Sequence, residues 1–289
     1  MIIQVKEHSL QAMLYCFVYK VYVYKYVSPY YNDSAEHRIS IQKGRTMRMK
    51  NLHPDAMLER LEWRRDIRNL MGRISADYSV REEGQIYARY WSRREDVCLG
   101  VNEGWYVGPD AVADYYQALD EEIMLSAKCV QKDFPEKLEG LTDEALKGVG
   151  VMSYIPVDSH VIEIADDGQT AKGLFNIRGS YNRITTSGPI AYWLFGWAAA
   201  DFILEDGQWK IWHMQWLRNV DVQCGTPFGQ TPEQFPEVEA YADMADFRMP
   251  EPTVKAVLME NYYTDRPFTK SPKVPEPYET FADTFSYGM

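Results

Sequence analysis

The stretch that decides the fold is SHVIEIADDGQTAKGLFNIRG at residues 159–179, followed by AYWLFGWAAADFILEDGQWKIWHMQW at residues 191–216. Each stretch has two apolar and aromatic runs around an acidic turn that ends in glycine. The turns are Asp166-Asp167-Gly168 and Glu205-Asp206-Gly207. Acidic-glycine turns between strand-like runs are a strong short-range signal for β-hairpins. The sequence therefore predicts two long antiparallel hairpins.

Two long helices are predicted before the hairpins. Between Pro54 and Tyr78, apolar residues recur at steps of three and four, which indicates an amphipathic helix. Gly108-Pro109-Asp110 then opens a second helix that runs from Ala111 to about Lys128. Helices followed by a long antiparallel sheet are typical of the α+β fold class.

The composition of the 289-residue chain narrows its range of partners. Hydrophobic residues make up 46% and charged residues 25%, which is ordinary for a globular protein. The net charge of −11, with no basic stripe, argues against a nucleic-acid partner and against binding to anionic membranes. The chain has 21 Tyr, 11 Phe and 8 Trp, which suit an apolar small-molecule ligand as well as a packed core.

The four cysteines are scattered and form no closely spaced set with each other or with histidine. The sequence therefore predicts neither a structural zinc site nor a disulfide framework, and the cytoplasm is the expected location. It also lacks a phosphate-binding loop and the glycine pattern of dinucleotide-binding folds. We expect no metal and no cofactor.

Three regions are predicted along the chain. Residues 1–48 form an N-terminal extension that we interpret as disordered or as lying outside the native coding sequence, with translation starting at Met47 or Met49. Residues 49–218 hold the helices and hairpins. Residues 219–289 are rich in proline, which argues against a core, and in aromatic residues, which are scarce in disordered segments. We expect this arm to pack on its own domain or on a neighbouring subunit.

Four stretches carry a resemblance to a known family: Ile67–Tyr78, GWYVGPDAV at 104–112, HVIEIADDGQTAKG at 160–173 and DFILEDGQWKIWH at 201–213. Over about residues 54–218 the chain resembles the SnoaL-like branch of the nuclear transport factor 2-like superfamily. The C-terminal PEPYETFADTFSY at 275–287 is similar to the tail of bacterial relatives. The resemblance implies a cone-shaped α+β barrel. In that fold a curved antiparallel sheet wraps around a long N-terminal helix and holds a pocket in its mouth.

The same resemblance suggests a class of reaction. Enzymes of this branch include scytalone dehydratase, bile acid dehydratase, polyketide cyclases and lyases of diaryl compounds. The implied activity is a cofactor-independent lyase, of dehydratase or aldol/deformylase type, that abstracts a proton from an apolar aromatic or polycyclic small molecule. An isomerase or cyclase with the same base stays open, as does a non-catalytic small-molecule-binding module, because a fold alone does not give a function.

Strict alternation along the last strand predicts which side chains reach the pocket. In the family the Trp-x-Ile face points into the cone, so the resemblance places His213 and Gln215 in the pocket. Histidine is the side chain best suited to general acid–base catalysis near neutral pH, so His213 is the expected general base. We expect the opposite face to be buried against another subunit of a homo-oligomer, a trimer or a dimer. That face carries Trp212, Met214 and Trp216.

Further catalytic residues are expected to assist this base. Dehydratases of the family carry an essential Tyr and Asp on the first helix, at positions where this chain has Ile74 and Ser79. Tyr78 and Asp77 are expected to stand in for them, with Tyr78 donating to a carbonyl or alkoxide and Asp77 orienting a histidine. His160 is expected on the inward face of its strand.

The remaining pocket walls are expected to be aromatic. The candidate substrate-binding residues are Trp105, Tyr106, Tyr154, Phe175, Trp197 and, beside them, Gln215. Several glutamates show no spacing that separates them from surface charges. These are Glu62, Glu82, Glu83 and Glu103.

Overall fold

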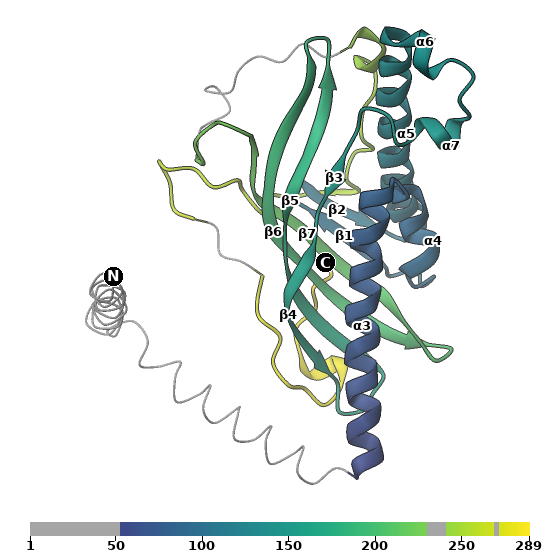
Figure 1. Ribbon diagram of the computed structural model, residues 1–289. Coiled ribbons are helices and arrows are strands. Elements are labelled where there is room, and N and C mark those ends of the chain that lie inside the picture. Colours follow the sequence, from purple (N-terminus) through teal and green to yellow (C-terminus); the bar gives the residue numbers. More distant parts are fainter. Residues whose placement is uncertain (1–52, 230–240, 269–271) are drawn as a thin grey trace, which may run out of the picture. The chain divides into compact units, whose positions relative to one another are not determined.

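The computed structural model describes residues 53–229, 241–268 and 272–289 (Figure 1). The predicted extension at residues 1–48 and the predicted translation start at Met47 or Met49 lie outside the described residues.

The two long helices are found where the sequence predicts them. α3 (Pro54–Val80) buries Ile67, Met71 and Ile74 of its apolar stripe. α5 (Pro109–Asp133) begins at a proline, which suits a first helical turn. The shorter helical elements are η2 (Glu83–Gln85), α4 (Ile86–Tyr90), α6 (Pro135–Leu138), α7 (Asp143–Leu146), η4 (Ala242–Met244) and η5 (Phe281–Asp283). Within the described ranges, no helix has the length and apolar character needed to cross a membrane.

One sheet contains all the named strands. They are β1 (Cys98–Val101), β2 (Gly104–Val107), β3 (Ser153–Tyr154), β4 (Val157–Ile164), β5 (Thr170–Thr185), β6 (Gly188–Glu205), β7 (Gln208–Gln223) and β8 (Val254–Lys255). The order is β3-β5-β6-β7-β1-β2-β8, with β4 also paired to β5, and β1 runs parallel to β7. The expected α+β fold, a long N-terminal helix with a large curved antiparallel sheet, is confirmed (Figure 1). The sheet is not closed into a barrel.

The two predicted hairpins supply four strands of this sheet. β4 pairs with β5 and β6 pairs with β7, each pair antiparallel around its acidic-glycine turn. In the second turn, Asp206 and Gly207 have φ angles of 50° and 74°. Aspartate and glycine adopt this left-handed region more readily than other residues, and such turns match the twist of the flanking strands.

The helices cover one face of the sheet, called here the helix face. Trp209, Ile211, Met214 and Trp216 of β7 share a single apolar core with the buried stripe of α3. Trp63 of α3 meets Trp209 edge to face, with ring centroids 5.9 Å apart.

A β-bulge in β7 decides which side chains reach this face. Consecutive residues of β6 pair with Ile211 and then with His213, so Trp212 is an extra residue in β7. One extra residue shifts the alternation of the side chains that follow it, here as far as a second bulge at Asn219. Ile211 before the bulge and Met214 after it therefore both lie in the core, although their spacing is odd.

The strict alternation expected from the sequence is therefore wrong beyond the bulge. Met214 and Trp216, expected to face another subunit, are only 0% and 7% exposed and lie in the core of their own chain. His213 and Gln215, expected in the pocket, point to the opposite face. The homo-oligomer stays a prediction. The apolar stripe from which it was inferred is not exposed at Met214 and Trp216.

Residues 272–289 cover that opposite face, called here the arm face. Tyr278 accepts a backbone hydrogen bond from Asp166 in the first hairpin turn, with the nitrogen and oxygen 3.0 Å apart. Tyr287 is 2% exposed and packs against Leu174 of β5. The arm of this chain thus supplies the apolar cover of its own sheet.

We expect Met214→Ala to lower the free energy of unfolding by about 2–5 kcal/mol, because truncation leaves a cavity in the core on the helix face. Urea unfolding monitored by fluorescence measures the change. Gln208→Ala, at an exposed position of the same strand, should stay within about 0.5 kcal/mol of the parent chain. Equal effects of the two changes would contradict the placement of Met214.

Candidate active site

A cavity of about 470 Å³ lies against the helix face, between α3, α5 and the strands β3, β5, β6 and β7. This volume falls within the range of small-molecule sites. Its charged and aromatic lining residues are Tyr78, Arg81, Glu83, Tyr115, Glu122, Tyr181, Arg183, Tyr192, Trp216, Arg218 and Phe247.

The end of α3 brings two charged residues to the cavity. Arg81 has a φ of 66°, and the Glu82 nitrogen donates to the Asp77 carbonyl over 2.9 Å. This hydrogen bond and the left-handed residue before it define the Schellman motif, in which glycine usually occupies the position of Arg81. An arginine at this left-handed position costs roughly 1–2 kcal/mol of backbone strain. The protein is therefore less stable with Arg81 than with a glycine here.

Arg81 and Glu83 form a buried ion pair. Arg81 Nη1 donates to Glu83 Oε1 over 2.9 Å, and the two side chains are 7% and 3% exposed. The second atoms of the pair, Arg81 Nη2 and Glu83 Oε2, are buried and have no hydrogen-bond partner among the described residues. Buried polar atoms are normally paired, so two orphaned atoms beside a cavity indicate a place for a ligand.

Burial raises the pKa of Glu83 from 4.5 to about 7. The Arg81 charge and a backbone hydrogen bond oppose this rise, as does Lys147, while the Asp120 charge adds to it. A carboxyl group with a pKa near neutrality exists in both protonation states at physiological pH. It can therefore accept or donate a proton during catalysis.

Tyr78 lies in the same cavity, as part of the last turn of α3. Its ring stacks on Trp216 with centroids 5.3 Å apart, which fixes the ring. No hydrogen bond engages its hydroxyl among the described residues, so this donor is available to a ligand. Burial raises its pKa well above 10.0, and Tyr116, Tyr115 and the Glu83 charge add to the rise. The hydroxyl therefore stays protonated.

A second polar group lies on the sheet wall. Arg218 Nη1 donates to Asp221 Oδ2 over 2.9 Å, and Tyr181 donates to the other oxygen of Asp221 over 2.6 Å. The ring of Tyr181 stacks on Tyr192 with centroids 5.2 Å apart and an interplanar angle of 13°. The cavity thus combines a carboxyl group with a pKa near neutrality, three guanidinium groups and flat aromatic walls.

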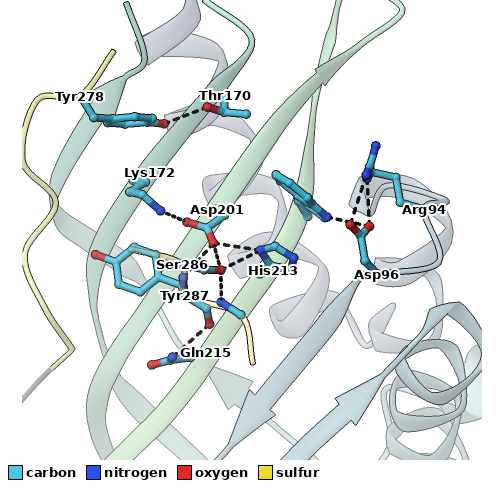
Figure 2. Close-up of polar contacts among 12 residues, drawn as sticks. Arg94, Asp96, Thr170, Lys172, Asp201, His213, Gln215, Tyr278, Ser286 and Tyr287 are labelled. Carbon is cyan, nitrogen blue, oxygen red and sulfur yellow. Dashed lines mark hydrogen bonds and ion pairs between the residues drawn. The ribbon is translucent and has the colours of Figure 1, made fainter. Parts of the chain in front are cut away.

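Among the expected catalytic residues, Tyr78 is the one that lines this cavity. His213, expected to be the base, instead belongs to a polar network beneath the arm (Figure 2). Asp201 Oδ2 lies 2.9 Å from His213 Nδ1 and accepts hydrogen bonds from Ser286 Oγ and the Tyr287 nitrogen, over 2.9 and 2.8 Å. Gln215 donates to the Tyr287 carbonyl over 3.0 Å. These two expected pocket residues therefore anchor the arm.

Lys172 completes the network on the arm face. Its Nζ lies 2.5 Å from Asp201 Oδ1, and both side chains are 0% exposed. Its ammonium group also lies within 6 Å of four rings of the arm, those of Tyr278, Phe281, Phe285 and Tyr287. Burial opposes ionisation of Asp201, but the His213 hydrogen bond and the Lys172 charge outweigh it and lower the pKa of this carboxyl.

The other expected assistants lie away from the cavity lining. Asp77 accepts a hydrogen bond from the Tyr90 hydroxyl over 2.8 Å and pairs with Arg89 over 3.0 Å, so it is neutralised rather than orienting a histidine. His160 is exposed at a bulge in β4, and its ring centroid lies 5.9 Å from that of Phe175. Burial and the nearby Arg68 and Arg64 charges lower its pKa.

The expected aromatic walls also take other positions. Phe175 is in the core, Tyr154 is 62% exposed, and Trp197 contacts Phe268 on the arm face. Two others lie around β2. Trp105 packs over Gly100, and the Tyr106 hydroxyl donates to the Pro250 carbonyl over 2.7 Å.

Sequence reasoning missed Glu83, Arg81 and Arg218. No spacing signal marks Glu83, because its burial depends on the turn after α3. The sequence places Trp216 on the opposite face, because a strictly alternating strand is assumed and nothing in the sequence reveals the bulge at Trp212. Within the described ranges, no group of three or more His, Cys, Asp and Glu side chains converges on a metal position.

Similarity to known proteins is found among solved structures, at low identity. No family model and no curated protein matches the chain. Matching solved structures include hexachlorocyclohexane dehydrochlorinase LinA type 2, at 15% identity over 61% of this chain and 97% of that one, with a TM-score of 0.41. They also include the type 3 enzyme from Novosphingobium barchaimii, at 16% identity over 60% and 99%, with a TM-score of 0.39.

A further match is a nuclear transport factor 2-like protein with a cystatin-like fold from Novosphingobium aromaticivorans. It is 16% identical over 60% of this chain and 89% of that one, with a TM-score of 0.37.

We expect Asp201→Asn to lower the free energy of unfolding by about 3–5 kcal/mol, because it leaves the Lys172 ammonium buried without a counter-charge. Asp158→Asn, which breaks the exposed pair with Arg178, should cost less than about 1 kcal/mol. Urea unfolding measures both, and limited proteolysis reports release of the arm. The Asp201 contribution is present above pH 3.8 and is lost as pH falls through its lower folded-state pKa. A cost as small as that of the exposed pair would contradict this role.

Proposed function

We propose that this protein is a cofactor-independent lyase that abstracts a proton from an apolar, aromatic small molecule held in the cavity on the helix face. The observation that carries the proposal is Glu83, a carboxyl group with a pKa of about 7 in a cavity that also holds the Tyr78 hydroxyl. Glu83 is the proposed base, in the place that the sequence assigned to His213.

The proposed chemistry uses the two groups together. Glu83 takes a proton from the carbon next to a carbonyl group, and the electrons of that C–H bond form a carbon–carbon double bond or an enolate. The leaving group departs with its bonding electrons, for example as hydroxide, which takes the abstracted proton back from Glu83 and leaves as water. Tyr78 donates a hydrogen bond to the oxygen on which negative charge develops. A fixed donor in a site with little water stabilises such charge more than water does.

The ion pair with Arg81 gives this base a defined position and protonation state. Since the guanidinium binds one oxygen of Glu83, the second oxygen has no hydrogen-bond partner among the described residues and stays available as the base. The Arg81 charge opposes the effect of burial on the Glu83 pKa, which keeps part of the carboxylate ionised at neutral pH. The strain accepted at Arg81 agrees with a functional rather than a structural role.

The first test is Glu83→Gln, assayed on a panel of diaryl and hydroxylated polycyclic ketones, with Glu82→Gln as its matched control. Loss of a general base costs about 10²–10⁴-fold in rate, so kcat/KM should fall by that factor in Glu83→Gln. Glu82 pairs with Arg89 on the other side of the turn and does not line the cavity, so the control should keep its turnover.

The outcomes separate the alternatives. Equal turnover of Glu83→Gln and the parent chain would exclude Glu83 as the base. Loss of turnover in His213→Gln with an intact fold would return the role to His213. Products without a departed group would indicate an isomerase or cyclase, and tight binding without turnover on any substrate would indicate a binding module.

A second test uses pH. The base must be ionised, so kcat/KM should rise with pH and level off above about 7, the pKa of Glu83 in the free protein. Arg81→Met removes a charge that lowers this pKa, so its midpoint should move to higher pH. If the pH midpoint of kcat/KM is the same in Arg81→Met as in the parent chain, the group that titrates in the reaction is not Glu83. Thermal unfolding of the variant checks that its fold is retained.

A further inference from the structure

We propose that the substrate is an aromatic carboxylate whose carboxylate group is bound by Arg218. This inference rests on the proposed function only in taking the cavity as the active site. It deepens that proposal by naming the class of molecule that enters.

Arg218 is held as a receptor for an anion. Its backbone is clamped by Asn102, which accepts from the Arg218 nitrogen over 2.9 Å and donates to the Arg218 carbonyl over 2.6 Å. Its side chain is 31% exposed, and Nη1 donates to Asp221. Its Nε and Nη2 have no hydrogen-bond partner among the described residues, and Arg218 lines the cavity. A guanidinium with free donors in a fixed position suits a planar, two-oxygen anion.

A second guanidinium lies on the same wall. Arg183 is exposed, and its guanidinium carbon lies 5.9 Å and 5.4 Å from the ring centroids of Tyr181 and Tyr192. No carboxylate pairs with it among the described residues. An exposed, unpaired cation beside the half-buried Arg218 favours the entry of negatively charged molecules.

The charge of the lining contrasts with the charge of the chain. The whole chain carries −11, yet three arginines and two glutamates line the cavity. Glu83 is one of those glutamates, and its raised pKa makes it partly neutral at pH 7. The lining thus carries more arginines than glutamates in an acidic protein, which favours an anionic ligand.

The apolar part of the ligand is indicated by the rings beside Arg218. Trp216 lies two residues before Arg218 on β7 and stacks with Tyr78, while Tyr181 and Tyr192 stack nearly parallel. Flat faces of this kind favour an aromatic ring. The charges of both Glu83 and Arg218 act on the Tyr78 hydroxyl, so a ligand bound at Arg218 extends toward the proposed base.

A carboxylate fits this wall better than a phosphate dianion. Asp221 binds the same guanidinium, and Glu122 also lines the cavity. Each additional negative charge on the ligand is repelled by these two carboxylates. The aryl phosphate is therefore an outcome that the test distinguishes.

The experiment measures binding of 2-naphthoate, 2-naphthamide and 2-naphthyl phosphate by calorimetry, with quenching of tryptophan fluorescence as a second readout. We expect the full-length chain to bind 2-naphthoate about 10- to 100-fold more tightly than the uncharged amide, the usual gain from a charge-assisted pair. Arg218→Met should remove this preference. Arg178→Met, on an arginine paired with Asp158 outside the cavity, should keep it.

A second variant keeps the proposal testable if Arg218→Met does not fold. Asp221→Asn preserves the shape and removes the competing charge, so it should tighten naphthoate binding and leave naphthamide unchanged. Equal affinity of the parent chain for acid and amide would overturn the proposal, as would an acid preference that survives in folded Arg218→Met. A preference for the aryl phosphate would replace the carboxylate with a phosphate ester.

The same measurements separate this inference from the proposed function. Glu83→Gln should bind 2-naphthoate at least as tightly as the parent chain, since the base is not the anchor. If Glu83→Gln retains turnover while the acid preference depends on Arg218, the assignment of the base fails and that of the ligand stands. If Glu83→Gln loses turnover but the parent chain binds acid and amide equally, the assignment of the base stands and that of the ligand fails.

Discussion

The first of two β-bulges in β7, at Trp212, is the constraint on which the arrangement of the molecule depends. Trp212 has no partner position on β6. The side chains that follow it therefore lie on the face opposite to the one that strict alternation predicts. The bulge keeps Trp209 and Ile211 in the core and adds Met214 and Trp216 to it. It also sends His213 to the arm face. A strand without the bulge would place a histidine in the core and two large apolar side chains beneath the arm.

The bulge gives the two faces of the sheet different roles. On the arm face, Lys172, Asp201 and His213 occupy neighbouring positions on β5, β6 and β7. The charges of Lys172 and Asp201 compensate each other, and Asp201 binds the arm through Ser286 and Tyr287 (Figure 2). A buried charge is stable only when it is paired and hydrogen-bonded, and the arm supplies part of that requirement. The helix face keeps a cavity, because α3 and α5 leave room in front of Trp216 and Arg218.

The proposed chemistry follows from how α3 ends. A left-handed residue closes the helix and turns the chain, and the arginine at that position holds Glu83 in a buried pair with orphaned atoms. Stability is lost twice here, through backbone strain and through unsatisfied polar atoms. The backbone strain and the unpaired polar atoms both lie beside the cavity. Such features are commonly found at ligand-binding sites. The aromatic wall and Arg218 extend the site from the base to a second point of recognition.

The sequence by itself determined the two hairpins, the two long helices and the α+β order, because acidic-glycine turns and periodic apolar residues are local signals. It also singled out Tyr78, whose place on the apolar stripe of α3 follows from helical periodicity. Only the tertiary structure decided the faces of β7, since a bulge depends on pairing between two strands. It also decided the burial of Glu83, because desolvation of a carboxyl group depends on neighbours distant in the chain. For the same reason the sequence assigned the base to His213, which the fold places beneath the arm.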